Sequence, residues 1–524
     1  MLVGDIVASN ACLFPNKRGI IDERVSLTWN QFNDRVNRLA NAMLGLGLKQ
    51  GDRVAIICEN CHEHAEFLFA IAKSGLIGSP INYRLTPEQI IRILNDCAPK
   101  VLFVQNKFAE VTEQIQRGVK SIDTFVGIGD GHGYAYDYES LLSQHSPVEP
   151  VAEVDEEDFF LVGYTTGTTG TSKGVILSHR NVMSGVVASS QAVGTTVTRN
   201  DMALEWAAFY TIAGIARLLS SSFVGATVVI CNFSARSFVE LIERERVSFM
   251  RLQPATFKMV KEYLETSDRK YDLSSLRAMG TPGGQNLSMA EMKEMLDYFE
   301  IPYSNAWKAY GMFESSSAVV YFVSENVAAA LSPGATEKDK KRFESLGKPV
   351  MGVKLRIVDE NDKDVPPGQT GEILLKSDSI MKGYWNKPEL TSQVLRGGWY
   401  HTSDLGRLDE DGYLYYEGRK DFVIKSGGFL VGPAEVENVI LRHPAVAEVA
   451  VIGVPDEMWG QAVKAVVCLK PGQHATEEEI KEHCRQCLAN YQVPKSVSFM
   501  EKLPREGVYG KVNIKELLKA YSRR

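Results

Sequence analysis

Short apolar runs alternate with helical segments through the first half of this chain, and this alternation is the strongest constraint on its fold. These strand-length runs cover residues 52–57, 101–105, 124–127, 158–164 and 226–231. Between several of them, apolar residues recur at helical spacing, as they do after Thr28, whose hydroxyl would form a capping box with Gln31. Strands that alternate with helices build layers of largely parallel sheet. We therefore expect an α/β fold.

The pattern changes from Gly347 onward, where short strands and turns replace the alternation. Strands are expected at 355–358 and 371–376. After Asp421 follows a stretch of about a hundred residues, the size of a small domain. Its expected elements are a helix over 433–441, strands over 446–454 and 462–469, and a helix from Thr476. This organisation indicates a β-rich subdomain and then a small α+β domain, with the boundary near 419–421.

Composition and charge exclude several classes of protein. The chain has 524 residues, of which 44% are hydrophobic and 23% charged, so disordered and fibrous classes are excluded. Its 58 basic and 65 acidic side chains give a net charge of −7, which argues against a nucleic-acid partner. No apolar run approaches the roughly 18–20 residues of a membrane span, and the N-terminus lacks a basic-then-apolar leader. We expect a soluble, cytoplasmic protein without a membrane span.

Four of the eight cysteines form two C-x-x-C pairs beside histidines. The pairs, Cys58 with Cys61 and Cys484 with Cys487, suggest a split zinc site, and the first pair with its following histidine matches a haem attachment pattern. We favour a simpler interpretation, in which Cys61, Cys484 and Cys487 lie on apolar faces of helices. Because buried cysteine packs as a small hydrophobe, no metal is expected at these cysteines.

A glycine- and threonine-rich loop at 164–174 carries the clearest chemical signal. It reads Tyr-Thr-Thr-Gly-Thr-Thr-Gly-Thr-Ser-Lys-Gly and directly follows an apolar run. Glycines allow close backbone approach, threonines offer hydroxyls, successive backbone N–H groups can form an anion nest, and Lys173 adds a cation. A Walker A loop needs Gly directly before its Lys, whereas Ser172 precedes Lys173 here. The loop is predicted to bind phosphate, and a flexible linker is the less fitting alternative.

This loop resembles the signature loop of the adenylate-forming superfamily, which includes acyl-CoA synthetases, luciferases and the adenylation domains of peptide synthetases. Five segments that resemble further motifs of the family follow in the family's order. They lie at residues 283–287, 310–314, 399–406, 418–427 and 510–513. Six motifs in this order are far more specific than any one of them. The resemblance implies a large N-terminal AMP- and acyl-binding domain over 1–418, a hinge over 419–421 and a mobile C-terminal domain over 422–524.

The resemblance also implies a nucleotide site. Asp404 would accept both ribose hydroxyls with its two carboxylate oxygens, and Arg419 would donate to the same ribose. Tyr310 would stack on adenine, and Glu314 would hold Mg²⁺ through carboxylate oxygen, the ligand that this ion prefers. The residues implied to bind ATP and AMP are Thr165, Thr166, Gly167, Thr168, Thr169, Gly170, Lys173, Gly283, Gly284, Gln285, Tyr310, Gly311, Met312, Asp404, Arg419 and Lys511.

Lys511 would be the main catalytic residue, together with Thr165 and Glu314. Attack of a carboxylate on the α-phosphate of ATP concentrates negative charge there, and a positioned cation stabilises that charge. By resemblance this lysine lies on the mobile domain, which closes for adenylation and then turns about Asp421 so that a thiol can reach the adenylate. The loop implied on the coenzyme A side comprises Lys425, Gly427 and Gly428.

Four residues depart from the family pattern. Phe313 replaces a threonine, Tyr210 replaces a common histidine, Ser172 replaces a proline, and Asn513 replaces an arginine two residues after the catalytic lysine. None of these changes removes a charge that the chemistry requires. Phe313 is the one expected to slow adenylation or to reshape the pocket.

The pocket for the carboxylic acid is implied to contain Tyr210, Gly283, Trp307, Met312 and Phe313. Bulky aromatic side chains would shorten the cavity, which favours a compact acid over a long fatty chain. Short, medium-length, cyclic and aromatic acids all stay open as candidate substrates.

Together these features predict an AMP-forming acyl-CoA ligase that uses ATP, Mg²⁺ and coenzyme A in a reversible reaction. The expected partners are the small-molecule carboxylate, ATP and coenzyme A, with a homodimer as an open alternative to a monomer. A carrier protein is a less favoured acceptor. Two other functions stay open: a luciferase-like adenylating oxygenase, and a non-catalytic metal-binding or regulatory protein built on a decayed ligase fold.

Overall fold

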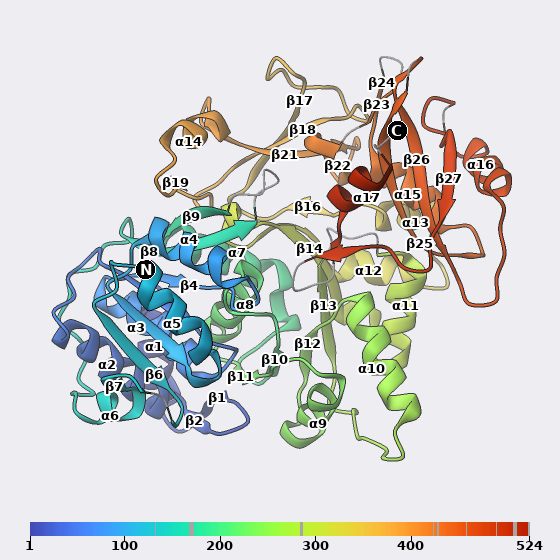
Figure 1. Cartoon of the computed structure of the whole chain (residues 1–524). Coiled ribbons are helices and arrows are strands. Elements are labelled where there is room, and N and C mark those ends of the chain that lie inside the picture. The colour runs from blue at the N-terminus through green and yellow to red at the C-terminus, as the bar shows by residue number, and fades with distance from the viewer. Residues whose placement is uncertain are drawn as a thin grey trace. The chain divides into compact units, whose positions relative to one another are not determined.

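The computed structural model describes residues 1–131, 133–166, 172–282, 287–422, 424–426, 429–456, 458–488, 490–506 and 511–521 (Figure 1). The chain forms two compact units. Unit 1 comprises Met1–Lys354 and Lys376–Tyr400, and unit 2 comprises Leu355–Leu375 and His401–Arg524. The hinge expected at 419–421 stays a prediction.

The first sheet of unit 1 has the strand order β19-β9-β8-β4-β3-β5-β6-β7. Its strands are β3 (Arg53–Ile57), β4 (Ile77–Pro80), β5 (Val101–Gln105), β6 (Thr124–Ile128), β7 (Tyr136–Asp137), β8 (Phe159–Thr166), β9 (Ser172–Ser178) and β19 (Gly383–Tyr384). Strands β3 to β8 pair in parallel, whereas β9 is antiparallel to β8 and β19 is antiparallel to β9. The parallel sheet expected from the alternation is confirmed.

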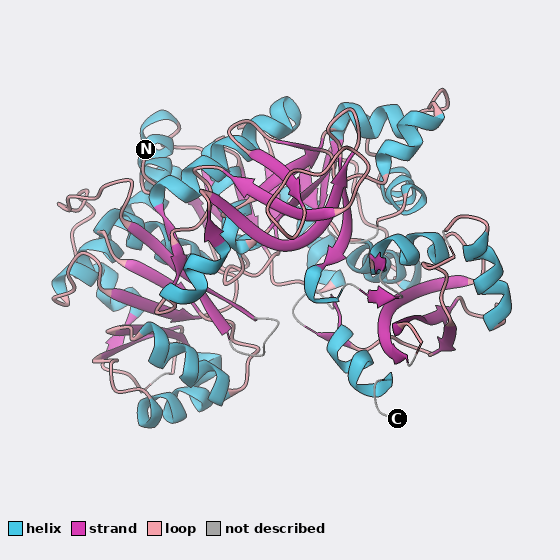
Figure 2. Ribbon diagram, turned by 90° about the horizontal axis from the view of Figure 1, so that it is seen from above, coloured by secondary structure: helices cyan, strands magenta, loops and turns pink. Residues whose placement is uncertain are grey.

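Helices cover both faces of this sheet, as Figure 2 shows. The helices around it are α1 (Asp5–Leu13), α2 (Trp29–Gly45), α3 (His62–Ser74), α4 (Pro87–Cys97), α5 (Ala109–Gly118) and α6 (Tyr138–Ser143). Helices α4 and α5 pack with Leu102 and Val104, whereas Phe67 of α3 and Tyr138 of α6 contact Phe103 on the opposite face. Since alternate residues of a strand point to opposite faces, β5 contributes to both cores.

The second sheet of unit 1 has the strand order β16-β15-β14-β13-β12-β10-β11-β1-β2. Its strands are β1 (Arg18–Ile21), β2 (Ser26–Thr28), β10 (Met202–Glu205), β11 (Thr227–Ile230), β12 (Phe249–Arg251), β13 (Ala278–Pro282), β14 (Ala306–Gly311), β15 (Ala318–Phe322) and β16 (Lys348–Pro349). The helices of this part of the chain are α7 (His179–Val193), α8 (Ile212–Phe223), α9 (Ala235–Glu245), α10 (Pro254–Thr266), α11 (Met289–Tyr298), α12 (Ser324–Leu331) and α13 (Glu337–Phe343). Strands β10 to β14 are parallel, and β15 and β16 turn antiparallel at one edge.

Unit 2 contains the expected short strands and a second layered core. The strands at its start are β17 (Lys354–Val358), β18 (Gly371–Lys376), β21 (Trp399–Leu408) and β22 (Leu414–Arg419), while α14 (Pro388–Val394) and β20 (Leu395–Arg396) belong to unit 1. The remaining elements are β23 (Ile424–Ser426), β24 (Phe429–Val431), α15 (Pro433–Leu441), β25 (Val446–Asp456), β26 (Gly460–Leu469), α16 (Glu477–Arg485), β27 (Ser496–Phe499), β28 (Arg505–Glu506), β29 (Lys511–Val512) and α17 (Ile514–Tyr521). Helices α15 and α16 pack with Val449 and Val451, and α17 packs with Ala450 and Ile452. Strands β25 and β26 are therefore covered on both faces.

Capping boxes fix where two of the predicted helices begin. The hydroxyl of Thr28 accepts from the backbone N–H of Gln31, and the side chain of Gln31 accepts from the backbone N–H of Thr28, at the start of α2. Thr476 and Glu479 make the same pair of bonds at the start of α16. Such caps satisfy N–H groups that have no partner within the helix, each worth about 1 kcal/mol.

The cysteines behave largely as the apolar pattern predicts. Cys58, Cys61 and Cys484 are buried in cores. The prediction was wrong for Cys487, which is exposed, because α16 ends at Arg485 and the chain leaves the helical register before that residue.

Among the described residues, no helix combines the length and the apolar character that crossing a membrane requires.

Candidate active site

The glycine- and threonine-rich loop is carried by the hairpin of β8 and β9. In the register of the two strands Thr165 lies opposite Lys173, and Thr166 lies opposite Ser172. Thr165 and Lys173 are both half-buried. The hairpin therefore brings a hydroxyl and an ammonium group, which are eight residues apart in the chain, side by side at the base of the loop.

Lys173 and Glu314 both lie against the side chain of Tyr384. The Tyr384 hydroxyl donates to Oε1 of Glu314 at 2.9 Å, and Nζ of Lys173 lies 5.4 Å from the centre of the Tyr384 ring. Strand β19 places Tyr384 opposite Val175 of β9. A cation and a carboxylate thus flank one buried tyrosine. Tyr384 lies outside the sequence motifs, and only its pairing with β9 identifies it.

Phe313 packs directly against the strand that leads into the loop. The side chain is buried, and its ring occupies the place where a side chain at Gly163 would begin. A Cβ atom at Gly163 would lie 1.8 Å from Cζ of Phe313. The residue that departs from the family pattern is therefore a packing partner of β8.

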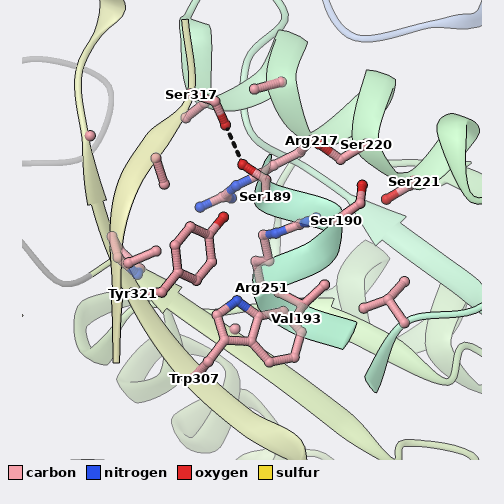
Figure 3. A pocket seen from close by; sticks show the side chains of 18 of the residues that line it. Ser189, Ser190, Val193, Arg217, Ser220, Ser221, Arg251, Trp307, Ser317 and Tyr321 are labelled. Atoms are coloured by element: carbon pink, nitrogen blue, oxygen red, sulfur yellow. Dashed lines mark hydrogen bonds between the residues drawn. The ribbon is translucent and has the colours of Figure 1, made fainter. Parts of the chain in front are cut away.

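A cavity of about 160 Å³ lies beside the carboxyl ends of the second sheet (Figure 3). Its walls come from α7, α8, β12, β13, β14 and β15. The residues that line it are Ser189, Ser190, Val193, Val197, Ile212, Ala213, Ala216, Arg217, Ser220, Ser221, Val224, Arg251, Gly280, Thr281, Pro282, Trp307, Ala309, Gly311, Met312, Ser317, Ala318 and Tyr321. The cavity is mixed in character, with apolar side chains beside serines and two arginines that the sequence motifs do not contain.

The residues predicted for the acid pocket have different surroundings. Trp307 and Met312 line the cavity. Trp307 stacks on Phe249 with ring centres 5.3 Å apart, and its indole fills the space beside Gly280 where a Cβ would lie only 2.9 Å away. Tyr210 is buried, meets the ring of Tyr83 edge-on at 5.2 Å, and is not among the residues that line the cavity. Gly283 lies outside the described residues.

In unit 2, Asp404 and Arg419 are cross-strand neighbours on β21 and β22. Nη1 of Arg419 lies 3.6 Å from Oδ1 of Asp404, and the Asp404 backbone N–H donates to the hydroxyl of Thr402 at 3.0 Å. The Asp404 side chain is buried, while that of Arg419 is 40% exposed. Two residues that the sequence motifs place 15 positions apart are thus brought together by the hairpin.

Tyr310 and Gly311 lie at the end of β14, and Glu314 follows in a single helical turn, Phe313–Ser315. Tyr310 is buried. At Gly311 a Cβ would lie 2.2 Å from the carbonyl oxygen of Ser317, so this close backbone approach requires glycine. The motif at 310–314 therefore turns sharply between β14 and β15.

Several predicted site residues lie outside the part of the chain that the structure describes. They are Gly167, Thr168, Thr169, Gly170, Gly283, Gly284, Gln285, Gly427 and Gly428. For four more the backbone is described but the side chain is not, namely Thr166 in β8, Asp421 after β22, Lys425 in β23 and Lys511 in β29. Their roles stay predictions.

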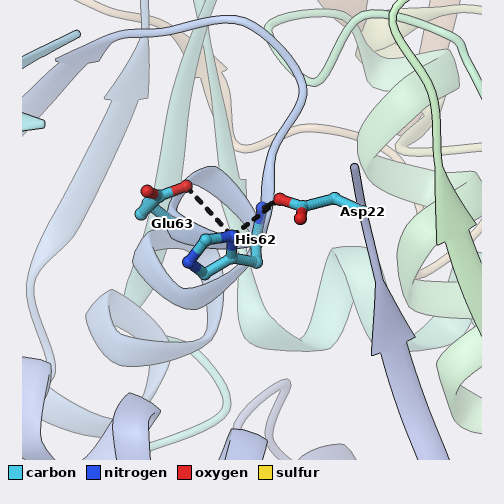
Figure 4. A group of neighbouring side chains, drawn as sticks. All are labelled: Asp22, His62 and Glu63. Carbon is cyan, nitrogen blue, oxygen red and sulfur yellow. Dashed lines mark hydrogen bonds and ion pairs between the residues drawn. The ribbon is translucent and has the colours of Figure 1, made fainter. Parts of the chain in front are cut away.

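A buried cluster of Asp22, His62 and Glu63 has the composition of a metal site (Figure 4). Oδ2 of Asp22 accepts from the backbone N–H of His62 at 3.0 Å and lies 2.6 Å from its Nδ1, and Glu63 forms an ion pair with Arg24. Burial opposes a charged imidazole, yet the hydrogen bond to Asp22 and the nearby carboxylates raise the pKa of His62. Protein donors thus already use these carboxylates, and the cluster is an ion-pair network that ties α3 to the start of the chain.

Comparisons with known proteins agree over nearly the whole chain. A family model described as AMP-binding enzyme matches residues 7–385, and one described as AMP-binding enzyme C-terminal domain matches residues 435–508. A fatty acid–[acyl-carrier-protein] ligase from Streptomyces coeruleorubidus is 31% identical over 96% of this chain and 93% of its own length. A feruloyl-CoA synthase from an Amycolatopsis species is 31% identical over 96% of both chains.

A solved structure, that of an anthranilate CoA ligase in complex with anthranoyl-AMP, superposes with a TM-score of 0.85. It is 28% identical, and the superposition covers 100% of this chain and 97% of that one.

Proposed function

This chain belongs to the AMP-binding, adenylate-forming enzymes, and from that premise we propose that it is an AMP-forming acyl-CoA ligase. In the first step a carboxylate oxygen of the acid bonds to the α-phosphorus of ATP and the bond to pyrophosphate breaks, which gives an acyl-adenylate. In the second step the sulfur of coenzyme A bonds to the acyl carbon, the bond between that carbon and the AMP oxygen breaks, and the thiol proton is released. The products are acyl-CoA and AMP.

The observation that carries this proposal is the grouping of Lys173, Glu314 and Tyr384 beside the glycine- and threonine-rich hairpin. An ammonium group attracts phosphate oxygens, and Thr165 adds a hydroxyl donor on the same side of the hairpin. A carboxylate oxygen is a suitable ligand for Mg²⁺, so Glu314 fits the role of holding the ion that accompanies ATP. When bound, that ion would offset the charge of the phosphates.

From the family resemblance, we assign adenine binding to Tyr310 and ribose binding to Asp404 and Arg419. The buried carboxylate of Asp404 offers two oxygens for two ribose hydroxyls, and the guanidinium of Arg419 beside it adds donors. Tyr310 provides an aromatic face for adenine. Lys511 is assigned to the α-phosphate, where the attack of the acid concentrates charge.

The proposed acid is compact. Of the three aromatic residues expected to shorten the pocket, Trp307 lines the cavity of about 160 Å³, and this supports a compact acid over a long fatty chain. The favoured acceptor is coenzyme A. Since one relative is named an acyl-carrier-protein ligase, a carrier protein is the acceptor to be tested beside it.

The experiment is pyrophosphate release from ATP and Mg²⁺ across a panel of carboxylic acids, each with and without coenzyme A. The panel contains acetate, butyrate, crotonate, cyclohexanecarboxylate, benzoate and decanoate. Release that depends on one acid and rises with coenzyme A, with the thioester identified by mass spectrometry, is the expected result. The Lys511→Ala variant is the control for contaminating activity.

Other outcomes point to the alternatives. Release that needs the acid but ignores coenzyme A favours a carrier protein, and release with oxygen consumption and no thioester favours an adenylating oxygenase. If folded protein releases no pyrophosphate with any acid, the decayed-fold alternative is favoured and the ligase activity is contradicted.

Two further expectations concern the whole protein. A cytoplasmic location and assembly as a homodimer stay predictions, which fractionation of the source cells and analytical ultracentrifugation test.

A further inference from the structure

One wall of the cavity is made of buried hydroxyl groups. The hydroxyls of Ser189 on α7 and Ser317 before β15 lie 2.8 Å apart, and both residues are at least 90% buried. Tyr321 of β15 presents its hydroxyl to the same Ser189. Figure 3 shows these three side chains grouped on one side of the cavity. A group that binds here meets hydrogen-bonding partners and not an apolar wall.

The side chain of Arg217 extends from α8 toward this set of hydroxyl groups. It lines the cavity, and in Figure 3 its guanidinium extends toward Ser189 and Tyr321. Burial raises the pKa of Tyr321, while the hydrogen bond to Ser189 and the positive charges of Arg251 and Arg217 act in the opposite direction. The guanidinium of Arg217 is thus close enough to influence that hydroxyl. Its planar fork of five N–H donors is able to bind several partners at once and matches the geometry of a carboxylate.

Arg251 also lines the cavity, and its own contacts hold it in place. Nη1 of Arg251 contacts Oε1 of Glu205 at 2.6 Å, and the guanidinium lies over the ring of Phe249 at 4.7 Å. Ser221 donates to the same Glu205 oxygen at 2.8 Å. Glu205 therefore offsets the charge of Arg251. None of the described residues that line the cavity is acidic.

The cavity also reaches the site of activation. Gly311 and Met312, which belong to the motif at 310–314, line it together with the hydroxyl wall, while Val193 and Trp307 form apolar surface beside them. An acid whose carboxylate is activated at that motif would extend its other end into the cavity. The far end would then meet Arg217 and the hydroxyl groups.

We propose that the acid carries a second anionic group, and that Arg217 binds it together with Ser189 and Tyr321. The substrate class is a compact dicarboxylic acid that is activated at one end only. This inference rests on the proposed ligase activity. An acid that ended in a methyl group would place an apolar end against a guanidinium and hydroxyl groups, which is a poor match in polarity.

The test compares acids of equal carbon number that differ only at the far end. Succinate is paired with butyrate, glutarate with valerate, and adipate with hexanoate, and monomethyl glutarate supplies a polar but uncharged end. Acid-dependent pyrophosphate release is measured for each. We expect kcat/KM for the preferred dicarboxylate to exceed that of its partner by about 100-fold or more, with most of the difference in KM.

Variants of Arg217 make the test specific to this side chain. Arg217→Met keeps the length but removes the charge, and it should lose about 100-fold in kcat/KM for the dicarboxylate while its use of the monocarboxylate stays level or improves. Arg217→Lys keeps the charge without the fork, and an intermediate loss is expected. Arg236→Met, at an exposed site on α9 that pairs with Glu240, is the matched control and should leave the preference unchanged.

Binding gives a readout that does not need turnover. Glutarate should raise the thermal unfolding temperature of the wild type and of Arg236→Met more than valerate does, and this difference should vanish in Arg217→Met. Thermal unfolding in buffer alone also shows whether each variant folds. If Arg217→Met does not fold, Arg217→Lys decides the question with the same two measurements.

The outcomes separate this inference from the ligase activity. Release with monocarboxylates that equals or exceeds release with dicarboxylates overturns the second anionic group and leaves the ligase standing. Equal use of glutarate and its monomethyl ester also overturns it, since the far end would then need polarity and not charge. If the folded wild type releases no pyrophosphate with any acid, the ligase activity is overturned and this inference with it.

Discussion

The glycine- and threonine-rich hairpin and the cavity beside the second sheet, both in unit 1, are built in different ways. The hairpin is one contiguous stretch, in which β8 and β9 set Thr165 opposite Lys173. The cavity takes its walls from helices and strands that are distributed along the chain from Ser189 to Tyr321. One site is made by local backbone geometry, and the other is made by packing.

Under the proposed function, this difference separates the binding of ATP from the recognition of the acid. Binding of phosphate requires glycines, hydroxyls and a cation at fixed spacing, because backbone N–H groups must approach the ligand. Recognition of an acid requires only a shape and a few polar groups, which many combinations of side chains provide. Substitutions in the two sites should therefore affect different substrates.

The largest effect is expected for Lys511→Ala. Removal of a cation that stabilises the charge at the α-phosphate should lower the rate of adenylation by about 100- to 1,000-fold. Formation of the thioester from chemically prepared acyl-adenylate should be nearly unaffected, since the predicted turn of the C-terminal domain would take this lysine away in that step. Single-turnover measurements of each half-reaction test this, and equal losses in both would contradict the two-conformation mechanism.

A smaller effect is expected for Asp404→Asn, which keeps the shape of the side chain but removes its charge. The hydrogen bonds to the ribose lose about 1.5 to 3 kcal/mol when the charged acceptor becomes neutral, so KM for ATP should rise roughly 10- to 100-fold. KM for the acid should stay the same. Steady-state kinetics with each substrate varied in turn separates the two, and a larger change for the acid would break the distinction between the sites.

Stability at low pH should depend on His179, which packs on Phe160 of β8 with ring centres 5.4 Å apart. Burial lowers the pKa of His179 to about 4. Since the unfolded chain takes up this proton first, near pH 6.5, stability is complete above that pH and is lost as pH falls toward 4. The loss between pH 7 and pH 5 amounts to about 2 kcal/mol for this group.

The His179→Gln variant should therefore unfold with a smaller dependence on pH. Urea denaturation of both proteins at pH 7 and pH 5 measures this. An unchanged loss of stability on acidification in the variant would show that other groups cause it.

Another effect on stability concerns the contact between Gly163 and Phe313. A methyl group at Gly163 would overlap the ring, so Gly163→Ala should cost about 1 to 3 kcal/mol of stability. In a Phe313→Ala background the same change should cost less, because the ring is gone. Gly334→Ala, where a Cβ would meet open space, is the matched control. Additive costs in this double-mutant cycle would contradict the packing role of Phe313.

The variant Phe313→Thr tests whether Phe313 affects the binding of ATP or the choice of acid. Since Phe313 packs on β8, the variant should change KM for ATP, whereas the order of preference among acids should stay the same. A changed order would place Phe313 in the acid pocket, as the sequence analysis expected.

The sequence predicted the elements well where local chemistry decides them. The strand at 101–105, the helix at 433–441 and the capping boxes at Thr28 and Thr476 follow from apolar spacing and side-chain caps. The pairing of Asp404 with Arg419 was anticipated only through the family resemblance. Residues that depend on long-range pairing were missed: Tyr384 reaches Glu314 because β19 adds to β9, and no local pattern marks it.

The arginines of the cavity could not be predicted for the same reason. Arg217 lies within a helix and Arg251 at the end of a short strand, where an isolated arginine is ordinarily a surface residue. Only the folded sheet shows that Arg251 meets Glu205 and that both arginines face one cavity.

The most direct test of the central claim follows one oxygen atom. If the acid attacks the α-phosphorus, an acid labelled with ¹⁸O in its carboxylate must transfer one labelled oxygen to AMP, because the thiol later displaces AMP from the acyl carbon. We predict AMP that carries one ¹⁸O atom and pyrophosphate that carries none. Label in inorganic phosphate, or AMP without label while thioester accumulates, would contradict an acyl-adenylate intermediate.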